Sequence, residues 1–269
     1  IEDGVLVAYN GAGGEVIVPE GVTALGDNVF SGNHLITKLV LPEGLTTIGY
    51  ASIYFLKNLT EIVYILDRSG SMSGLEKDTI GGYNSFLKKQ KAEPGQAVVT
   101  TVLFDDKCET IHDRVDIRKV EPLTNRQYYA RGMTALLDAV GETIKRVSNR
   151  HKNALPSEVP AKTIVVITTD GCENASMEYT YRMVKDMVCL QKEKYGWEFL
   201  FLGANIDAIE TAADFGITKE RAVTYEADEV GTELNFDSVC EVVSGMRASR
   251  PVSQSWKQKI EEHSKKTGR

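Results

Sequence analysis

The run Thr163-Ile164-Val165-Val166-Ile167 constrains the fold most, because an unbroken series of β-branched residues suits a strand buried on both faces of a parallel sheet. Apolar stretches at 62–66, 97–104 and 197–202, and a weaker one at 222–225, have a similar character. Helical patterns separate them, at 75–91, 134–148, 179–195 and 208–215, and a final helix is expected from 236 to 247. Residues 108–115 are expected to return antiparallel. The alternation predicts an α/β domain with a doubly wound, mostly parallel sheet.

Residues 16–65 contain an internal repeat. Val18-Pro19-Glu20-Gly21-Val22-Thr23 returns 23 positions later as Leu41-Pro42-Glu43-Gly44-Leu45-Thr46, and Gly26 returns as Gly49. The period lies within the range of about 20–29 residues that is typical of leucine-rich repeats. Alternating apolar residues predict a short strand in each repeat, and Pro-Glu-Gly turns the chain after it. The segment is therefore predicted to form a short N-terminal solenoid.

The order of a strand, then P-E-G-[VL]-T-x-[IL]-G, then an aromatic-containing stretch resembles the BspA-like leucine-rich repeats of bacteria. We predict a repeat segment at 1–61, an α/β domain at 62–250 and a C-terminal helical tail at 251–269. So few repeats bury little apolar surface, so we expect the repeat segment to depend on the larger domain for stability. Its small core is predicted to contain Leu39, Leu41, Ile48 and Phe55.

The join between the two segments has no linker. Continuing the register by one more repeat would place Pro-Glu-Gly on Ile65-Leu66-Asp67, so the repeat strand runs directly into the first strand of the α/β domain. The sequence leaves open whether this join is a natural or an engineered fusion.

Three motifs gather at the edge of the predicted sheet where ligands bind, outside the carboxyl ends of parallel strands. One strand ends in Asp67-Arg68-Ser69-Gly70-Ser71, a D-x-S-x-S pattern; another ends in Thr168-Thr169-Asp170-Gly171; and Gly132-Met133-Thr134 opens a helix. A serine-rich helix cap would explain D-x-S-x-S alone. A hard divalent cation prefers oxygen ligands, which two carboxylates and three hydroxyls provide. We therefore predict a metal site formed by Asp67, Ser69, Ser71, Thr134 and Asp170.

Together these residues resemble the metal-ion-dependent adhesion site (MIDAS) of the von Willebrand factor A (VWA) family, over residues 62–247. The resemblance implies a Rossmann-like domain that binds Mg²⁺ or Mn²⁺. It implies direct ligation by Ser69 and Ser71, ligation by Asp67 and Asp170 directly or through water, and participation of Thr134 that depends on conformational state. It further implies an adhesion or interaction module whose cation engages an acidic residue of a protein partner.

Two other functions are weighed against this one. In the first, the leucine-rich-repeat surface is an interaction scaffold and the metal site is idle. In the second, Asp67 is a phosphatase nucleophile, but Ser69 replaces the second aspartate that such a motif needs. The sequence also lacks a P-loop, a G-x-S-x-G elbow and an H-E-x-x-H motif. We therefore predict binding rather than catalysis.

The net charge of −7 argues against a nucleic-acid partner, because binding to the phosphate backbone normally requires a concentrated basic face. No run of 18 apolar residues is present, so no membrane span is predicted. The sequence does not identify the protein partner, the cellular location or the oligomeric state.

Overall fold

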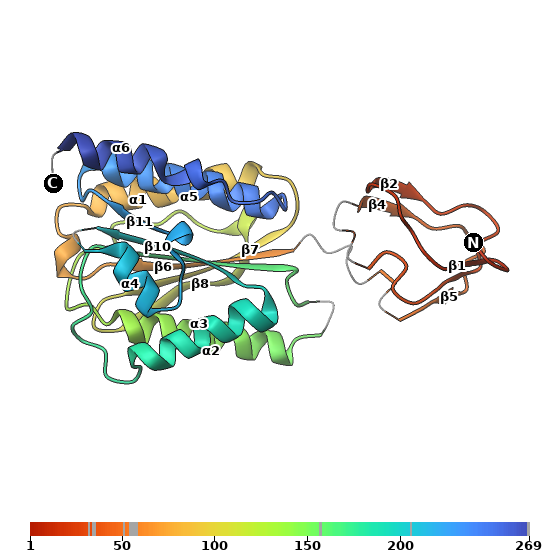
Figure 1. Cartoon of the computed structure of the whole chain (residues 1–269), viewed down its shortest axis with the longest axis horizontal. Coiled ribbons are helices and arrows are strands. Elements are labelled where there is room, and N and C mark those ends of the chain that lie inside the picture. The colour runs from red at the N-terminus through yellow and green to blue at the C-terminus, as the bar shows by residue number, and fades with distance from the viewer. Residues whose placement is uncertain are drawn as a thin grey trace. The chain divides into compact units, whose positions relative to one another are not determined.

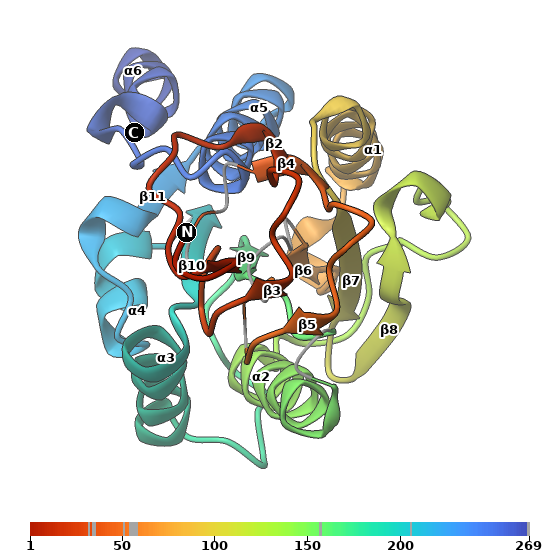
Figure 2. The same cartoon turned by 90° about the vertical axis from the view of Figure 1, so that its right-hand side faces the viewer.

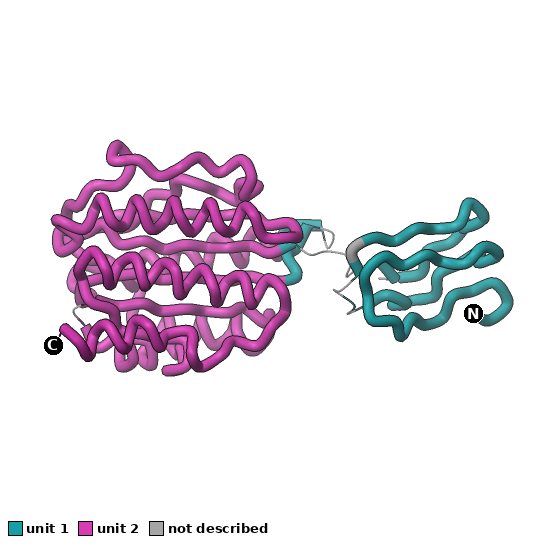
Figure 3. The backbone as a smooth tube through the Cα atoms, turned by 90° about the horizontal axis from the view of Figure 1, so that it is seen from above, with its two compact units in different colours: residues 1–59, 153–161 teal, residues 60–152, 162–269 magenta. Residues whose placement is uncertain are grey.

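The computed structural model describes residues 1–31, 33, 36–50, 52–53, 59–155, 158–204 and 206–267. The chain divides into two compact units (Figure 3). Unit 1 comprises residues 1–59 and 153–161, and unit 2 comprises residues 60–152 and 162–269.

The described part of unit 2 contains a six-stranded sheet (Figure 1) with the order β11-β10-β9-β6-β7-β8, which Figure 2 shows. The pairs β11–β10, β10–β9, β9–β6 and β6–β7 are parallel, and β8 runs antiparallel to β7. The α/β class with a mostly parallel sheet is therefore confirmed. The strands are β6 (Thr60–Asp67), β7 (Ala97–Phe104), β8 (Cys108–Asp116), β9 (Lys162–Thr169), β10 (Glu198–Ala204) and β11 (Ala222–Tyr225).

Helices cover both faces of this sheet (Figure 2). One face is covered by α1 (Glu76–Ala92), α5 (Glu229–Arg247) and α6 (Gln258–Thr267), and the other by α2 (Leu136–Asn153), α3 (Tyr181–Tyr195) and α4 (Ala208–Asp214). Helix α5 begins earlier than the predicted residue 236, because the Asp228 carboxylate accepts a hydrogen bond from Gly231 N at 2.6 Å and caps the first turn.

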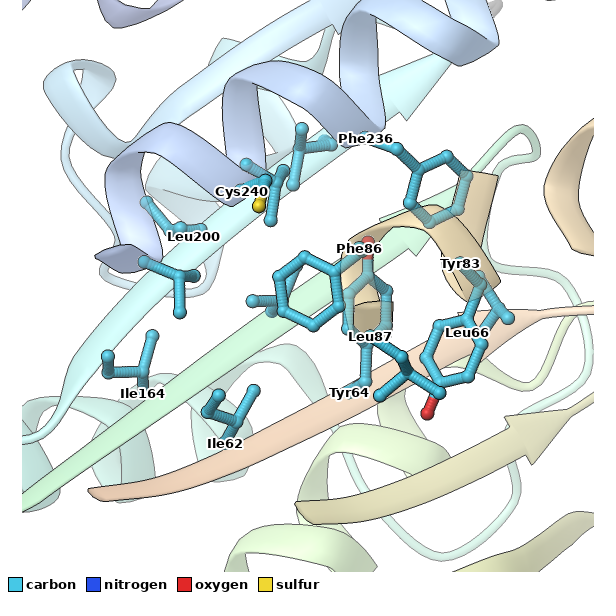
Figure 4. Close-up of a cluster of buried hydrophobic side chains, with 14 of the residues drawn as sticks. Ile62, Tyr64, Leu66, Tyr83, Phe86, Leu87, Ile164, Leu200, Phe236 and Cys240 are labelled. Carbon is cyan, nitrogen blue, oxygen red and sulfur yellow. The ribbon is translucent and has the colours of Figure 1, made fainter. Parts of the chain in front are cut away.

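Strand β6 is buried at every position, as its place in the middle of the sheet requires. Tyr64 packs against the helices of one face, and Val63 and Ile65 pack against those of the other. The Tyr64 ring meets Tyr83 and Phe86 of α1 edge-on, each with 5.4 Å between centroids (Figure 4). These aromatic contacts fix the strand from which the D-x-S-x-S motif emerges, since buried aromatic pairs add to the free energy gained by burial.

Unit 1 contains two small parallel sheets. One pairs β2 (Gly14–Ile17) with β4 (Ile36–Val40), and the other has the order β1-β3-β5, with β1 at Val5–Leu6, β3 at Ala24–Leu25 and β5 at Thr47–Ile48. Val16 pairs with Leu39 and Ala24 pairs with Thr47, and Thr46 Oγ1 donates to Thr23 O across an offset of 23 residues. The strand pairing thus has the period of the repeat, while the leucine-rich-repeat assignment itself stays a prediction.

The core of unit 1 differs from the predicted one. Its buried apolar residues are Val16, Val18, Val22, Leu25, Val29, Phe30 and Ile36, and Leu39 packs against them as expected. The predictions for Leu41 and Ile48 are wrong, because these side chains are 38% and 47% exposed. Leu25, the counterpart of Ile48 one repeat earlier, lies in the middle strand β3 between β1 and β5. Ile48 lies in the edge strand β5, with which no later strand of the described residues pairs. Phe55 lies outside the described residues.

Residues near the C-terminus join the core of unit 2. Trp256 and Ile260 are buried with the residues of α5 and β11, and Trp256 Nε1 donates to Glu220 O at 3.0 Å. Over the described ranges, we find no helix with the length and apolar character that a bilayer crossing requires.

Candidate metal site

The two aspartates of the site follow neighbouring parallel strands. Asp67 is the last residue of β6, and Asp170 comes directly after β9. Leu66 pairs with Thr168, so both carboxylates emerge at the same edge of the sheet. The chain leaves β6 toward β7 on one side and reaches β9 on the other, which makes this the point where the strand order reverses. Ligands of open α/β sheets bind at such a reversal.

Hydrogen bonds link the predicted ligands to each other. Ser69 Oγ lies 3.0 Å from Ser71 Oγ, and Ser71 Oγ donates to Asp170 Oδ1 at 2.6 Å. Thr134 joins them beside Gly171, where an added Cβ would lie 3.1 Å from Ser71 Oγ and 3.2 Å from Thr134 Oγ1. The structure therefore brings Ser69, Ser71, Thr134 and Asp170 together.

The fifth predicted residue, Asp67, is held by two neighbours. Its Oδ1 accepts a hydrogen bond from Ser69 N at 2.7 Å, and its Oδ2 accepts one from Thr169 Oγ1 at 2.6 Å. Both oxygens are oriented by these bonds, and the side chain is fully buried. Thr169 was not among the predicted site residues. Its position immediately before Asp170, at the end of a strand, is the signal that could have found it.

Burial disfavours the charged forms of both carboxyls. It raises the pKa of Asp67 to about 6; the hydrogen bonds from Thr169 and Ser69 act in the opposite direction, and the nearby charge of Asp170 adds a small further rise. Burial also raises the pKa of Asp170, although the hydrogen bond from Ser71 opposes it. The ionised forms of these two buried carboxyls would therefore be stabilised by a positive charge placed beside them.

The oxygen atoms present fit a hard divalent cation. Asp170 Oδ2 is buried and has no hydrogen-bond partner. Buried polar atoms normally have such a partner, because burial removes their hydrogen bonds to water. Ser71, next to it, is exposed, so the cluster is open to solvent on one side. Elsewhere in the described part of the chain, no three His, Cys, Asp or Glu side chains gather as another type of metal centre would need. Two carboxylates and three hydroxyls match the oxygen preference of Mg²⁺.

Main-chain hydrogen bonds anchor the segment that carries Thr134. Arg131 N donates to Arg68 O at 2.9 Å, Gly70 N donates to Gly132 O at 3.1 Å, and Ala135 N donates to Asp105 O at 2.9 Å. Asn174 adds a further contact, because its Oδ1 accepts from Thr134 N at 2.9 Å. The segment therefore runs alongside the D-x-S-x-S loop and is fixed at both ends.

A buried ion-pair network lies next to this loop and was not predicted. Arg68, the second residue of the D-x-S-x-S motif, is 1% exposed, and its Nε donates to Asp105 Oδ2 at 2.9 Å. Its Nη1 donates to Glu109 at 2.7 Å, and Arg131 Nε donates to the same Asp105 oxygen at 2.8 Å. Asp105 also stabilises the turn that follows β7, because its Oδ1 accepts a hydrogen bond from Lys107 N at 2.9 Å.

No protein-family model matches the chain, and no curated protein is similar to it at a significant level. Among solved structures, proximal thread matrix protein 1 from the mussel byssus is 13% identical; the similarity covers 84% of this chain and 69% of that one, with a TM-score of 0.47. A second structure of the mussel protein, with a zinc-occupied MIDAS motif, is 15% identical with a TM-score of 0.49, and the similar region spans about half (54%) of that chain.

A von Willebrand factor type A protein from Catenulispora acidiphila is also similar, at 12% identity and a TM-score of 0.47, over 70% of this chain and 43% of that one. Identities and TM-scores in this range do not establish a family.

Proposed function

We propose that this chain binds Mg²⁺ or Mn²⁺ through Asp67, Ser69, Ser71, Thr134 and Asp170, and that the cation engages an acidic residue of a protein partner. One observation carries the proposal: the buried Asp170 Oδ2 has no hydrogen-bond partner, although Ser71 Oγ bonds the other oxygen of the same carboxylate and is itself linked to Ser69 Oγ. The resemblance of these residues to the MIDAS of VWA domains supports the same function.

The protein residues divide the work of binding. Thr169 Oγ1 and Ser69 N orient the Asp67 carboxylate, and Ser71 orients that of Asp170. The three hydroxyls contribute oxygen atoms without negative charge, so two carboxylates provide all of the formal charge at the site. A bound divalent cation would supply an electrophilic position for one further carboxylate from outside the chain. These residues thereby favour binding of an acidic partner over catalysis.

Calorimetric titration with Mg²⁺ and with Mn²⁺ tests the metal site. Wild type should bind both ions, and Asp170→Asn should lose most of the heat because the unpaired oxygen becomes part of a neutral amide. Asp186→Asn, which removes the same charge from the exposed face of α3, serves as the matched control. Equal heats from wild type and Asp170→Asn would contradict the proposal.

The second candidate function is interaction through unit 1. It is favoured by the exposure of apolar side chains there, since Ile17 is 67% and Tyr50 is 82% exposed. A pull-down of partners with Mg²⁺ and with a chelator separates the two functions. Chelation should release a partner held through the metal site, whereas retention of the partner, together with its loss in an Ile17→Ser, Tyr50→Ser variant, would assign the contact to unit 1.

A further inference from the structure

An arginine in the segment that leads to Thr134 is held in one position. Arg131 Nε donates to Asp105 Oδ2 at 2.8 Å, and its Nη1 donates to the Tyr129 hydroxyl at 2.5 Å. Its guanidinium also lies over the Tyr129 ring, 4.9 Å from the centroid. An arginine normally loses rotational freedom when it forms an ion pair, and here that loss has already occurred in the free protein.

Main-chain hydrogen bonds fix the course of the segment that carries Arg131. Residues 129–134, which we call the Arg131 loop, run alongside the Asp67–Ser71 loop through the bonds Arg131 N to Arg68 O and Gly70 N to Gly132 O. Met133 is 57% exposed and lies between Arg131 and the predicted ligand Thr134 in the chain. The loop thus presents a cation, an apolar side chain and a metal-binding hydroxyl in succession.

The positive charge of Arg131 is only partly offset. Asp105 is its one ion-pair partner among the described residues, and Asp105 also pairs with the buried Arg68. Glu109 forms an ion pair with Arg68, and it acts on Arg131 only through its nearby charge. Nη2 of Arg131 has no hydrogen-bond partner in the described ranges, and its side chain is 41% exposed. This nitrogen can therefore donate to an incoming anion, as arginine does in carboxylate recognition.

We propose that the partner is a protein segment with two acidic side chains and an apolar side chain between them. One carboxylate reaches the metal site, the second pairs with Arg131, and the apolar side chain packs on Met133. The inference rests on the proposed function, which accounts for the first carboxylate only. It adds the Arg131 loop as the surface that selects among acidic partners.

Synthetic peptides test this selection, with the whole chain at saturating Mg²⁺ and fluorescence anisotropy as the measurement. The panel contains two glutamates separated by one, two or three residues that include a leucine. Each peptide has two matched control peptides: one in which glutamine replaces the second glutamate, and one in which serine replaces the leucine. The tightest diacidic peptide should bind about fivefold more tightly than its glutamine match, the upper range for a solvent-exposed ion pair.

Variants assign the difference to the loop. In Arg131→Gln the two peptides should bind equally, whereas Arg182→Gln, a charge-matched control on α3, should keep the difference. Met133→Ser should abolish the preference for leucine over serine. Arg131→Lys keeps the charge without the planar fork and should keep part of the difference. A difference that persists in Arg131→Gln, or diacidic peptides that bind no more tightly than their matches, would overturn the inference.

Metal calorimetry separates this outcome from failure of the proposed function. If wild type binds no Mg²⁺, the proposed function fails and the inference falls with it. If wild type and Arg131→Gln bind Mg²⁺ equally but the peptides show no difference, the inference alone is overturned. Equal Mg²⁺ affinity in Arg131→Gln also shows that the Asp67–Ser71 loop has kept its structure.

Discussion

Replacement of Asp67 by asparagine tests two effects of its carboxylate separately: the destabilisation that comes from burying a negative charge, and the binding of a cation. The side chain is fully buried, and burial raises its pKa from 3.8 to about 6. At about 1.4 kcal/mol per pKa unit, the ionised carboxylate destabilises the metal-free protein by about 3 kcal/mol. Asparagine can still accept the hydrogen bond from Ser69 N and can donate to Thr169 Oγ1. Without metal, the variant is therefore expected to be more stable than wild type by about 3 kcal/mol.

The sign of the pH dependence follows from the direction of the shift. A carboxyl with a raised pKa in the folded state favours folding most below its unfolded value of 3.8, and this contribution is lost as the pH rises through about 6. In urea unfolding with a chelator, wild type and Asp67→Asn should have similar free energies of unfolding near pH 3.8. At neutral pH, the variant should have the higher free energy of unfolding. The affinity of wild type for Mg²⁺ should fall below pH 6, because protons then compete for Asp67.

Added metal should reverse the ranking. A ligand that binds only the folded state adds about 4.1 kcal/mol at a thousandfold excess over its Kd, which exceeds the advantage of about 3 kcal/mol that Asp67→Asn has without metal. Only wild type should gain this stabilisation. Asp186→Asn should follow wild type in every condition. If Asp67→Asn is less stable than wild type at neutral pH in chelator, the carboxylate is not strained by burial and the electrostatic reasoning is refuted.

Three further results are expected. Arg68→Met should lower the free energy of unfolding by about 3–5 kcal/mol in urea, because it leaves the buried Asp105 with one partner fewer; a loss below 1 kcal/mol would show that Arg131 alone satisfies it. Phe86→Ala should also cost about 3–5 kcal/mol, since this ring is buried against Tyr64, and a change confined to metal affinity would contradict the packing described. A fragment of residues 1–60 should not melt cooperatively in circular dichroism, whereas 59–269 should, because unit 1 has a small core; a cooperative melt of 1–60 would refute this.

The strands and helices of unit 2 could be predicted because hydrophobic pattern dominates them. The stretch 97–104 coincides with β7, and 222–225 coincides with β11. The start of α5 could not be placed from pattern alone. Its first turn contains Gly231 and Thr232, which have low helix propensity, and the Asp228 cap compensates for them.

The candidate site was predictable only in part. Parallel pairing of β6 with β9 brings together the oxygen donors of the two motifs that follow these strands. Thr134 is brought to them by the main-chain hydrogen bonds of residues 131–135. The Arg68–Asp105 pair was not predictable, because a charged residue between two predicted ligands is expected to face solvent, and its burial depends on a partner 37 positions away. The exposure of Ile48 likewise depends on whether another strand pairs with β5 in the sheet. The repeat pattern does not specify this pairing.

The segment that carries Thr134 is anchored by main-chain atoms, while its recognition chemistry resides in side chains. Arg131 N, Gly132 O and Ala135 N make the bonds that fix its course, and none of them depends on residue type beyond the left-handed conformation of Gly132, with φ of +68°. Substitutions at positions 129, 131 and 133 can thus alter the contact surface and leave the ligand position intact. A single substitution in this loop could therefore change the proposed partner contact and leave the proposed cation site as it is.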